Sequence, residues 1–278
     1  MGRAGGSVPG QAGALHALVA EVDAALSRFR PDSDVGRLNQ AAGAWVPVGE
    51  HLVAVARAAE RYRVETGGVF SAVTAADGAG RALRLRPAGA RGWEARLDDD
   101  CQVDFGAIAK GYAADLVRDR AAATGVLASL GTSSVSVGGD APRGGAWRIA
   151  LGSPWHELDE TLGYLEVPCG SFSMSGIRGH RLGVEPVVVR HVRDPRTGEE
   201  AHTDLCSVAV VSDDGMRSEA ISTAALVLGL EDGMALCRRL GVDAVFLTAS
   251  GRLFASPGLA SRIALRPGIE ERLTALRP

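Results

Sequence analysis

The sequence predicts an α+β fold of mixed, mostly antiparallel sheets with helices packed on them, and it leaves open two interleaved subdomains. Helical periodicity is found near the N-terminus and again after residue 215. Between these regions, residues 147–211 hold several short segments in which apolar and polar residues alternate. Helices that are segregated from antiparallel strands are typical of α+β proteins rather than doubly wound sheets.

The first part of the chain is expected to be mainly helical. Residues 1–10 are interpreted as a disordered leader, and residues 11–278 as a single domain. Residues 11–29 carry leucines and valines on one helical face, which predicts an amphipathic helix. A second helix is predicted over residues 51–66, and the glycine at position 67 ends it.

The next part is expected to enter the interior and then to form a hairpin. Residues 69–74 are predicted to be buried, and residues 75–102 form a polar, Arg-rich hairpin region. Residues 103–115 are interpreted as the end of a strand, a turn of small residues and a helix that runs to about Ala123. A strand is predicted over residues 135–140.

The last part alternates strands with two helices. The strands are predicted at residues 147–151, 162–167, 171–174, 187–192, 205–211 and 243–248. The helices are predicted at residues 215–228 and 232–240, and a last hairpin closes the chain.

Composition excludes several classes of protein. A net charge of −3 and the absence of a basic run give no basis for binding nucleic acid. No apolar run reaches the roughly 18 residues of a transmembrane segment, and no secretory signal region is visible, so a cytoplasmic location is favoured. Four separated cysteines without a CxxC pair are interpreted as buried free thiols: Cys101, Cys169, Cys206 and Cys237.

Residues 103–115 are the first candidate for a functional site. Their small residues leave the backbone nearly bare where a helix begins, which favours phosphate binding by free N–H groups. Lys110 is the only lysine among thirty Lys and Arg residues, which indicates a site that requires a compact ammonium group. An ordinary surface lysine on a turn explains the same residues equally well.

A candidate metal site lies on the predicted helix over residues 215–228. Glu219 and Thr223 are four residues apart, so both oxygens point from one helical face. A carboxylate, a hydroxyl and a backbone carbonyl form the hard oxygen set that suits Mg²⁺. The alternative is a carboxylate that interacts with the first turn of its own helix.

Two further polar residues are candidates on local grounds. His191 follows a predicted strand, with Asp194 three residues on, and an imidazole so placed can act as a general base. Asn39 is the only asparagine, which indicates a specific polar contact. The alternatives are a histidine that satisfies its own loop and an Asx-type turn.

No nucleophile elbow, Walker A sequence or dinucleotide fingerprint is present. In its ordered set of short motifs, however, the chain resembles the FAD:protein FMN transferase (ApbE) family. The matching stretches are residues 29–39, 66–70, 103–115, 136–140, 174–176, 191–198 and 207–229.

The resemblance implies a Mg²⁺-dependent reaction in which FAD is split at its pyrophosphate. FMN passes to a Ser or Thr hydroxyl of an acceptor protein, and AMP leaves. The implied metal ligands are the carbonyl of Ala107, the carboxylate of Glu219 and the hydroxyl of Thr223, with Ser222 as a neighbouring option. The implied FAD contacts are Asn39, Phe70, Ser71, Ala72, Asp104, Lys110 and the backbone of Arg193. His191 is the implied proton acceptor, and Lys110 and Asp194 are grouped with it as candidate catalytic residues.

The chain departs from the family pattern at several positions. Glu219 stands where an Asp is usual, Ser71-Ala72 where Asp-Pro is expected, and Met174 where a Thr is usual. The N-terminal strand with a Met-Gly-Thr element is absent. Two alternatives therefore stay open: a Mg²⁺-dependent FAD pyrophosphatase and a non-catalytic FAD-binding protein. In each case we expect the oxygens at 107, 219 and 223 to converge.

Overall fold

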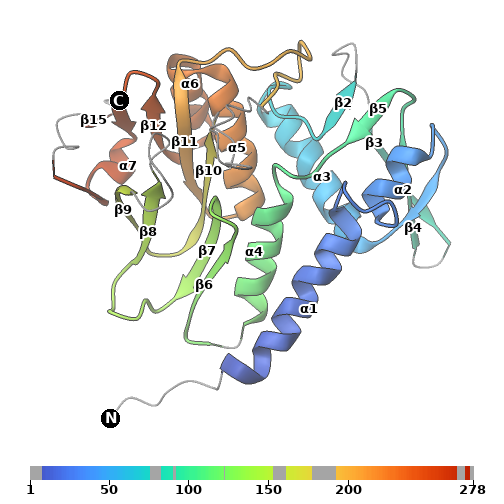
Figure 1. Cartoon of the computed structure of the whole chain (residues 1–278), viewed down its shortest axis with the longest axis horizontal. Coiled ribbons are helices and arrows are strands. Elements are labelled where there is room, and N and C mark those ends of the chain that lie inside the picture. Colours follow the sequence, from blue (N-terminus) through green and yellow to red (C-terminus); the bar gives the residue numbers. More distant parts are fainter. Residues whose placement is uncertain are drawn as a thin grey trace, which may run out of the picture.

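The computed structural model describes residues 8–75, 83–89, 92–121, 123–152, 161–176, 192–267 and 273–275. Figure 1 shows helices grouped around one large sheet, with the N-terminal helices to one side of it. The helices are α1 (Val8–Leu26), α2 (Asp34–Gln40), α3 (Glu50–Glu65), α4 (Ala109–Arg120), α5 (Gly215–Leu228), α6 (Leu230–Leu240) and α7 (Pro257–Ala260).

Fifteen strands form four sheets in the described part of the chain. The strands are β1 (Val46–Val48), β2 (Val73–Ala75), β3 (Leu83–Ala88), β4 (Gly92–Leu97), β5 (Cys101–Val103), β6 (Gly125–Leu130), β7 (Ser134–Gly139), β8 (Trp147–Gly152), β9 (Thr161–Val167), β10 (Gly170–Gly176), β11 (Leu205–Ser212), β12 (Asp243–Thr248), β13 (Leu253–Ala255), β14 (Ile263–Leu265) and β15 (Leu273–Ala275). The sheet orders are β15-β13-β12-β11-β10-β7-β6, β1-β4-β3, β14-β9-β8 and β2-β5. Only the β13–β15 pairing is parallel among these strands, so the predicted α+β class is confirmed.

The seven-stranded sheet has a different cover on each face. Along β11, Val208 and Val210 belong to one hydrophobic cluster with residues of α5 and α6, whereas Ala209 between them belongs to a second cluster with β8 and β9. Neighbouring residues of a strand point to opposite faces. The helices therefore pack on one face, and the β14-β9-β8 sheet packs on the other (Figure 1).

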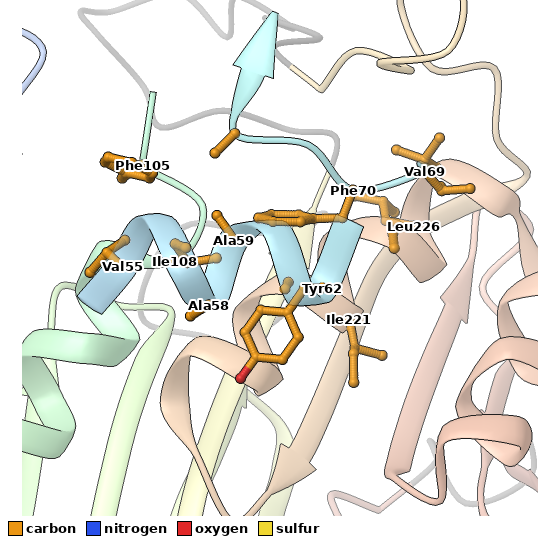
Figure 2. Close-up of a cluster of buried hydrophobic side chains, with 14 of the residues drawn as sticks. Val55, Ala58, Ala59, Tyr62, Val69, Phe70, Phe105, Ile108, Ile221 and Leu226 are labelled. Atoms are coloured by element: carbon orange, nitrogen blue, oxygen red, sulfur yellow. The ribbon is translucent and has the colours of Figure 1, made fainter. Parts of the chain in front are cut away.

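The helical side of the molecule has a continuous core. Figure 2 shows Phe70, Phe105, Ile108 and Ile221 of α5 arranged around α3, which carries Tyr62. All five side chains are 2% exposed or less. One hydrophobic cluster thus connects the N-terminal helices, the segment that precedes α4 and the helix α5. This core fixes the start of α4 relative to α5, where the candidate site lies.

Most predicted elements are confirmed, and α5 and β12 have the predicted bounds. The prediction of a leader over residues 1–10 is wrong at its end, because α1 already begins at Val8. Pro9 lies in the first turn, where a helix tolerates proline since that turn has no internal acceptor for its N–H groups. Near the C-terminus, β12 and β13 form an antiparallel hairpin, whereas the strands after it have distant partners: β14 pairs with β9, and β15 pairs in parallel with β13. Local alternation predicts a strand but not a distant partner.

The predicted strand at 187–192 lies outside the described residues, apart from Val192, which is in no strand.

The four cysteines divide into one exposed and three buried thiols. Cys169 is exposed, which corrects the expectation that all four are buried, whereas Cys101, Cys206 and Cys237 are buried. Burial raises the pKa of the Cys237 thiol to about 12. We therefore expect a thiol reagent at pH 8 to modify only Cys169 in the folded protein and all four cysteines after denaturation. Mass spectrometry of the modified peptides checks this, and rapid modification of Cys237 in native protein would contradict it.

No helix in the described ranges is long and apolar enough to cross a membrane.

Candidate functional site

The beginning of α4 and the middle of α5 meet through an ion pair. The Nζ atom of Lys110 lies 3.0 Å from Oε1 of Glu219. The Glu219 side chain is only 4% exposed, whereas that of Lys110 is 41% exposed. The structure thus brings the only lysine of the chain to the carboxylate that the sequence selected as a metal ligand. We call these two residues the Lys110–Glu219 pair.

Two glycines allow the two helices to approach this closely. A Cβ atom added to Gly111 would lie 2.2 Å from the carbonyl oxygen of Gly215, and one added to Gly215 would lie 2.5 Å from that of Gly111. Both distances are far below van der Waals contact, so no side chain fits at either position. The close contact leaves Lys110 and Glu219 on neighbouring turns of the two helices.

The carboxylate of Glu219 binds the N-terminus of α4. Its Oε2 accepts a hydrogen bond of 2.9 Å from the N–H of Gly111, and Ser134 of β7 donates to Oε1. Ile108, the residue that caps α4, makes no side-chain hydrogen bond to the helix. A carboxylate is favourable there because the first N–H groups of a helix carry partial positive charge. The anion at this helix start is therefore a residue of the chain itself.

This arrangement corrects the expectation of free N–H groups in the turn. The N–H of Gly106 donates to the Asp104 carboxylate, and those of Ile108 and Ala109 donate to the carbonyl of Phe105. With Gly111 bonded to Glu219, four of the small turn's donors have protein acceptors. The expectation of a nearly bare backbone therefore does not hold for these four N–H groups.

Three hydroxyl groups form a cluster on β10 and on the turn of α5 that follows Glu219. Ser175 Oγ of β10 is 2.8 Å from Ser222 Oγ and 3.0 Å from Thr223 Oγ1. Ser222 also donates to the carbonyl of Glu219, at 3.1 Å. Sequence reasoning assigned Ser222 and Thr223 to the site but gave Ser175 no role. The sequence feature that could have identified Ser175 is the alternation of Ser171, Ser173 and Ser175, which places three hydroxyls on one face of a strand.

A divalent cation fits the chemistry of these donors. The Nζ of Lys110 lies 2.8 Å from the carbonyl oxygen of Gly106 as well as 3.0 Å from Glu219, so a carbonyl and a carboxylate already converge on one cation. Ala107 is the next residue after Gly106, and Thr223 carries a hydroxyl one helical turn after Glu219. Such hard oxygen donors are those that Mg²⁺ accepts. A group of three or more His, Cys, Asp or Glu side chains suited to a metal is absent from the described ranges.

Asn39 holds the strand that leads into the site. Its side-chain amide donates to the carbonyl of Val103 at 3.0 Å and accepts from the N–H of the same residue at 2.7 Å. The next residue, Asp104, accepts from the N–H of Gly106 and forms an ion pair of 3.2 Å with Arg28. Asn39 is thus anchored to backbone, and Asp104 faces a partly exposed region.

The segment at Phe70 lies against the same turn through its backbone. The carbonyl of Ala72 accepts a 2.8 Å hydrogen bond from the N–H of Asp104. The ring of Phe70 is buried in the core (Figure 2), so it has no surface for a ligand. Ser71 forms a local turn, because its hydroxyl both donates to and accepts from the backbone of Val73.

The side chains of Arg193 and Asp194, in the turn after residue 191, form hydrogen bonds within that turn rather than with the Lys110–Glu219 pair. Asp194 accepts hydrogen bonds from the guanidinium and the N–H of Arg196, which hold the pKa of its carboxyl below the ordinary value. Arg193 donates to the carbonyl of Gly198 at 2.9 Å. His191 lies outside the described residues. The Asp194 carboxylate therefore stabilises its own turn.

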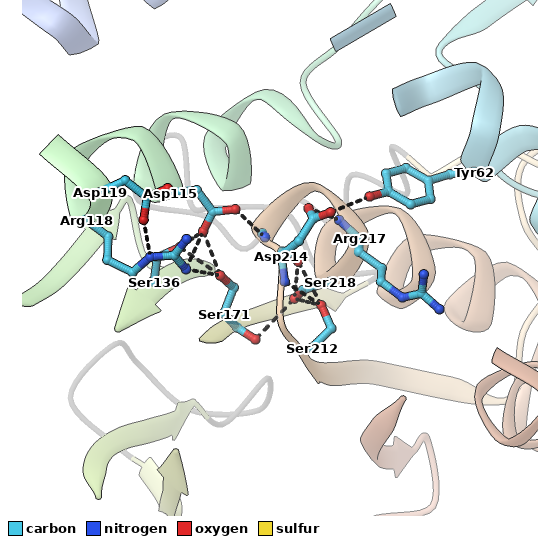
Figure 3. A network of polar contacts seen from close by, with 11 residues as sticks. Tyr62, Asp115, Arg118, Asp119, Ser136, Ser171, Ser212, Asp214, Arg217 and Ser218 are labelled. Carbon is cyan, nitrogen blue, oxygen red and sulfur yellow. Dashed lines mark hydrogen bonds and ion pairs between the residues drawn. The ribbon is translucent and has the colours of Figure 1, made fainter. Parts of the chain in front are cut away.

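A second polar network lies behind the site and was not anticipated (Figure 3). The carboxylate of Asp115, on α4, accepts a 2.7 Å hydrogen bond from the N–H of Gly215 at the start of α5. It also accepts from Ser136 of β7 and Ser171 of β10, and it pairs with Arg118 at 3.0 Å. Asp115 therefore connects both helices of the site to the sheet beneath them.

Comparisons with curated proteins show similarity over part of their length. The FAD:protein FMN transferase of Klebsiella pneumoniae (strain 342) is 34% identical over 148 residues, which are 53% of this chain and 46% of that protein. That of Treponema pallidum (strain Nichols) is 32% identical over 173 residues, covering 58% and 48%. The chain spans about half the length of these curated relatives.

Solved structures share the fold at low identity. The flavinyl transferase ApbE of Pseudomonas stutzeri aligns with a TM-score of 0.75 and 24% identity, covering 96% of this chain and 92% of that one. The ApbE protein of Thermotoga maritima aligns with a TM-score of 0.78 and 20% identity, covering 92% of each chain. The model of the ApbE family matches residues 7–77 and 79–246. This match covers most of the chain, which therefore belongs to the ApbE family.

Proposed function

We propose that this protein is a Mg²⁺-dependent FAD:protein FMN transferase, which moves FMN from FAD to a Ser or Thr hydroxyl of an acceptor protein and releases AMP. The observation that carries the proposal is the Lys110–Glu219 pair, whose carboxylate lies on the helix that also carries the hydroxyls of Ser222 and Thr223. It is supported by family membership and by curated relatives named FAD:protein FMN transferase.

In a phosphoryl transfer, these residues would bind the metal ion and neutralise charge on the phosphates. The carbonyl of Ala107, the carboxylate of Glu219 and the hydroxyl of Thr223 would hold Mg²⁺, with Ser222 close by. The ion would neutralise charge on the bridging phosphates of FAD. The Lys110 ammonium, held over the turn by Gly106, adds a second positive charge for the same phosphates.

The remaining residues would bind the nucleotide and take the proton. Asn39 positions the strand before Asp104 through its two bonds to Val103. Asp104 and the backbone at Ser71-Ala72 and Arg193 would contact FAD, as the family resemblance implies. His191 would accept the proton of the incoming hydroxyl, and Asp194 orders the turn that follows it.

An alternative function keeps the metal site but uses water as the acceptor, which makes the protein an FAD pyrophosphatase. Another is FAD binding without catalysis, favoured by Ser71-Ala72 and Met174 in place of the family's usual residues. In both alternatives Lys110 and Glu219 keep their roles in binding.

One incubation separates these three functions. The protein is mixed with FAD, Mg²⁺ and a candidate acceptor that presents a Ser or Thr on an exposed segment. Flavin fluorescence on the denatured acceptor band supports transfer. FMN and AMP without labelled acceptor indicate hydrolysis, and intact FAD that co-elutes with the protein indicates binding only. An acceptor with the target hydroxyl replaced by alanine is the control.

Replacing His191 by alanine is expected to leave FAD binding intact and to lower the transfer rate by at least about 100-fold, the usual contribution of a general base. Transfer is measured by in-gel flavin fluorescence, and FAD affinity by quenching of flavin fluorescence on binding. His202 provides a matched control, because it is exposed and lies beyond the turn. An unchanged transfer rate in His191→Ala would assign the proton to another base.

A further inference from the structure

We propose that the Lys110 ammonium and a divalent cation are alternative counter-ions of Glu219, so that loading the ion releases Lys110 from the carboxylate. The inference rests on the proposed function, because it concerns the same metal site. It gives Lys110 two states: bound to Glu219 in the metal-free protein, and free to meet an anionic substrate when the ion is present.

The argument begins with the hydrogen-bond capacity of the carboxylate. Each carboxylate oxygen offers about two acceptor positions. Oε1 of Glu219 already receives Lys110 Nζ and Ser134 Oγ, and Oε2 receives the N–H of Gly111. An ion that binds through Oε1 must therefore displace one of its two donors.

Lys110 is the donor that can leave. Ser134 is 1% exposed and lies on β7, which is paired on both sides, with β6 and β10. The Lys110 side chain is 41% exposed, long and flexible, so its head group can move into solvent without disturbing the backbone. Electrostatic repulsion between a divalent ion and the neighbouring ammonium also favours the departure of Lys110 from Glu219.

The buried carboxylate explains why one of the two cations is always needed. Glu219 is 3% exposed, and a charge removed from water is costly unless it is paired. In the metal-free protein the ammonium supplies this charge. The carbonyl of Gly106, which binds the same Nζ at 2.8 Å, holds the ammonium in place and lies next to the carbonyl of Ala107.

The wild-type protein offers a direct measurement because it has a single lysine. Protein labelled with ¹³C,¹⁵N-lysine gives one side-chain signal, from Lys110, apart from any amine at the N-terminus. Titration with Mg²⁺ in the absence of FAD is expected to move this signal towards that of a free lysine side chain. In Glu219→Gln the signal is expected to start near the free position and to stay there. A wild-type signal that does not move while the ion binds would overturn the inference.

A second measurement uses Mn²⁺, whose free concentration is read by electron paramagnetic resonance. Removing a competitor that occupies more than nine-tenths of the sites raises apparent affinity at least about tenfold. Lys110→Met is therefore expected to bind Mn²⁺ at least about tenfold more tightly than wild type. Arg120→Met is the matched control, because Arg120 is an exposed cation at the far end of the same helix. Its affinity should stay within about twofold of wild type.

The outcomes separate this inference from the proposed function. Mn²⁺ binding by wild type, with equal or weaker binding by Lys110→Met, overturns the competition but leaves the metal-dependent transferase standing. Glu219→Gln serves as the reference that lacks the metal-binding carboxylate. If wild type and Lys110→Met bind Mn²⁺ no more tightly than Glu219→Gln does, the metal site is removed, and both proposals fail with it. If Lys110→Met fails to fold without metal, the lysine signal of the wild-type protein still decides.

Discussion

Glu219→Gln is expected to lower FMN transfer by more than about 100-fold, because Glu219 is proposed as a direct metal ligand and losing even an outer-shell partner of a ligand costs about 10- to 100-fold. Glutamine keeps the size of the side chain but removes the charge that pairs with Lys110 at 3.0 Å. It also places an amide where Oε1 and Oε2 now accept from Ser134 and Gly111. One of these donors then faces an NH₂ group, so stability should fall by about 2 kcal/mol.

Two variants make this result specific. Glu219→Asp keeps the charge but shortens the side chain by one methylene, so it should retain Mg²⁺ dependence while losing contact with Gly111. Glu231→Gln removes an exposed carboxylate from the first turn of the next helix and should change stability by less than about 1 kcal/mol. Transfer is measured at saturating Mg²⁺, and unfolding by urea. Full activity in Glu219→Gln would remove the assignment of this carboxylate to the metal.

Gly111→Ala is expected to cost about 3 kcal/mol of folding stability, the upper end of what overpacking usually costs. The new Cβ would lie 2.2 Å from the carbonyl oxygen of Gly215, and both groups belong to helix backbones. The two helices must move apart, which lengthens the Lys110–Glu219 contact. At about 2–4 °C per kcal/mol for a chain of this size, the melting temperature should fall by about 6–12 °C.

Gly13→Ala is the matched control for this prediction. Gly13 also lies inside a helix, α1, and a Cβ added there has nothing within 4 Å. Alanine should therefore stabilise the protein by up to about 1 kcal/mol through its higher helix propensity. Thermal unfolding followed by circular dichroism compares the two variants. Equal melting temperatures for Gly111→Ala and wild type would show that the helices are not in the contact described.

Much of the fold follows from local patterns in the sequence. The helix at Gly215–Leu228 was predicted with its observed bounds, and its i, i+4 spacing placed Glu219 and Thr223 on one face. The family resemblance predicts that Glu219 lies at the turn before α4, and the structure places its carboxylate against Gly111 and Lys110 in the first turn of α4. The bonding there was not predictable, because Gly111 and Glu219 are 108 residues apart. Their contact depends on a helix packing that no local pattern encodes.

The glycines and serines of the site were the hardest residues to interpret from sequence. The small residues around Gly111 predict space for a ligand, whereas at Gly111 this space is filled by α5. The serines of β10 break the expected apolar pattern of a buried strand. Their partners, Asp115 among them, become apparent only when α4 and α5 are placed on the sheet.

The serine face of β10 also determines how α5 can move. An apolar helix face slides on an apolar sheet at little cost, but α5 rests on directional bonds: Ser218 to the carbonyl of Ser171, and Ser175 to Ser222 and Thr223. A shift by one residue, about 1.5 Å along the axis, would break all of them together. These bonds therefore fix the position of α5 along β10, and with it the position of the Glu219 carboxylate at the start of α4.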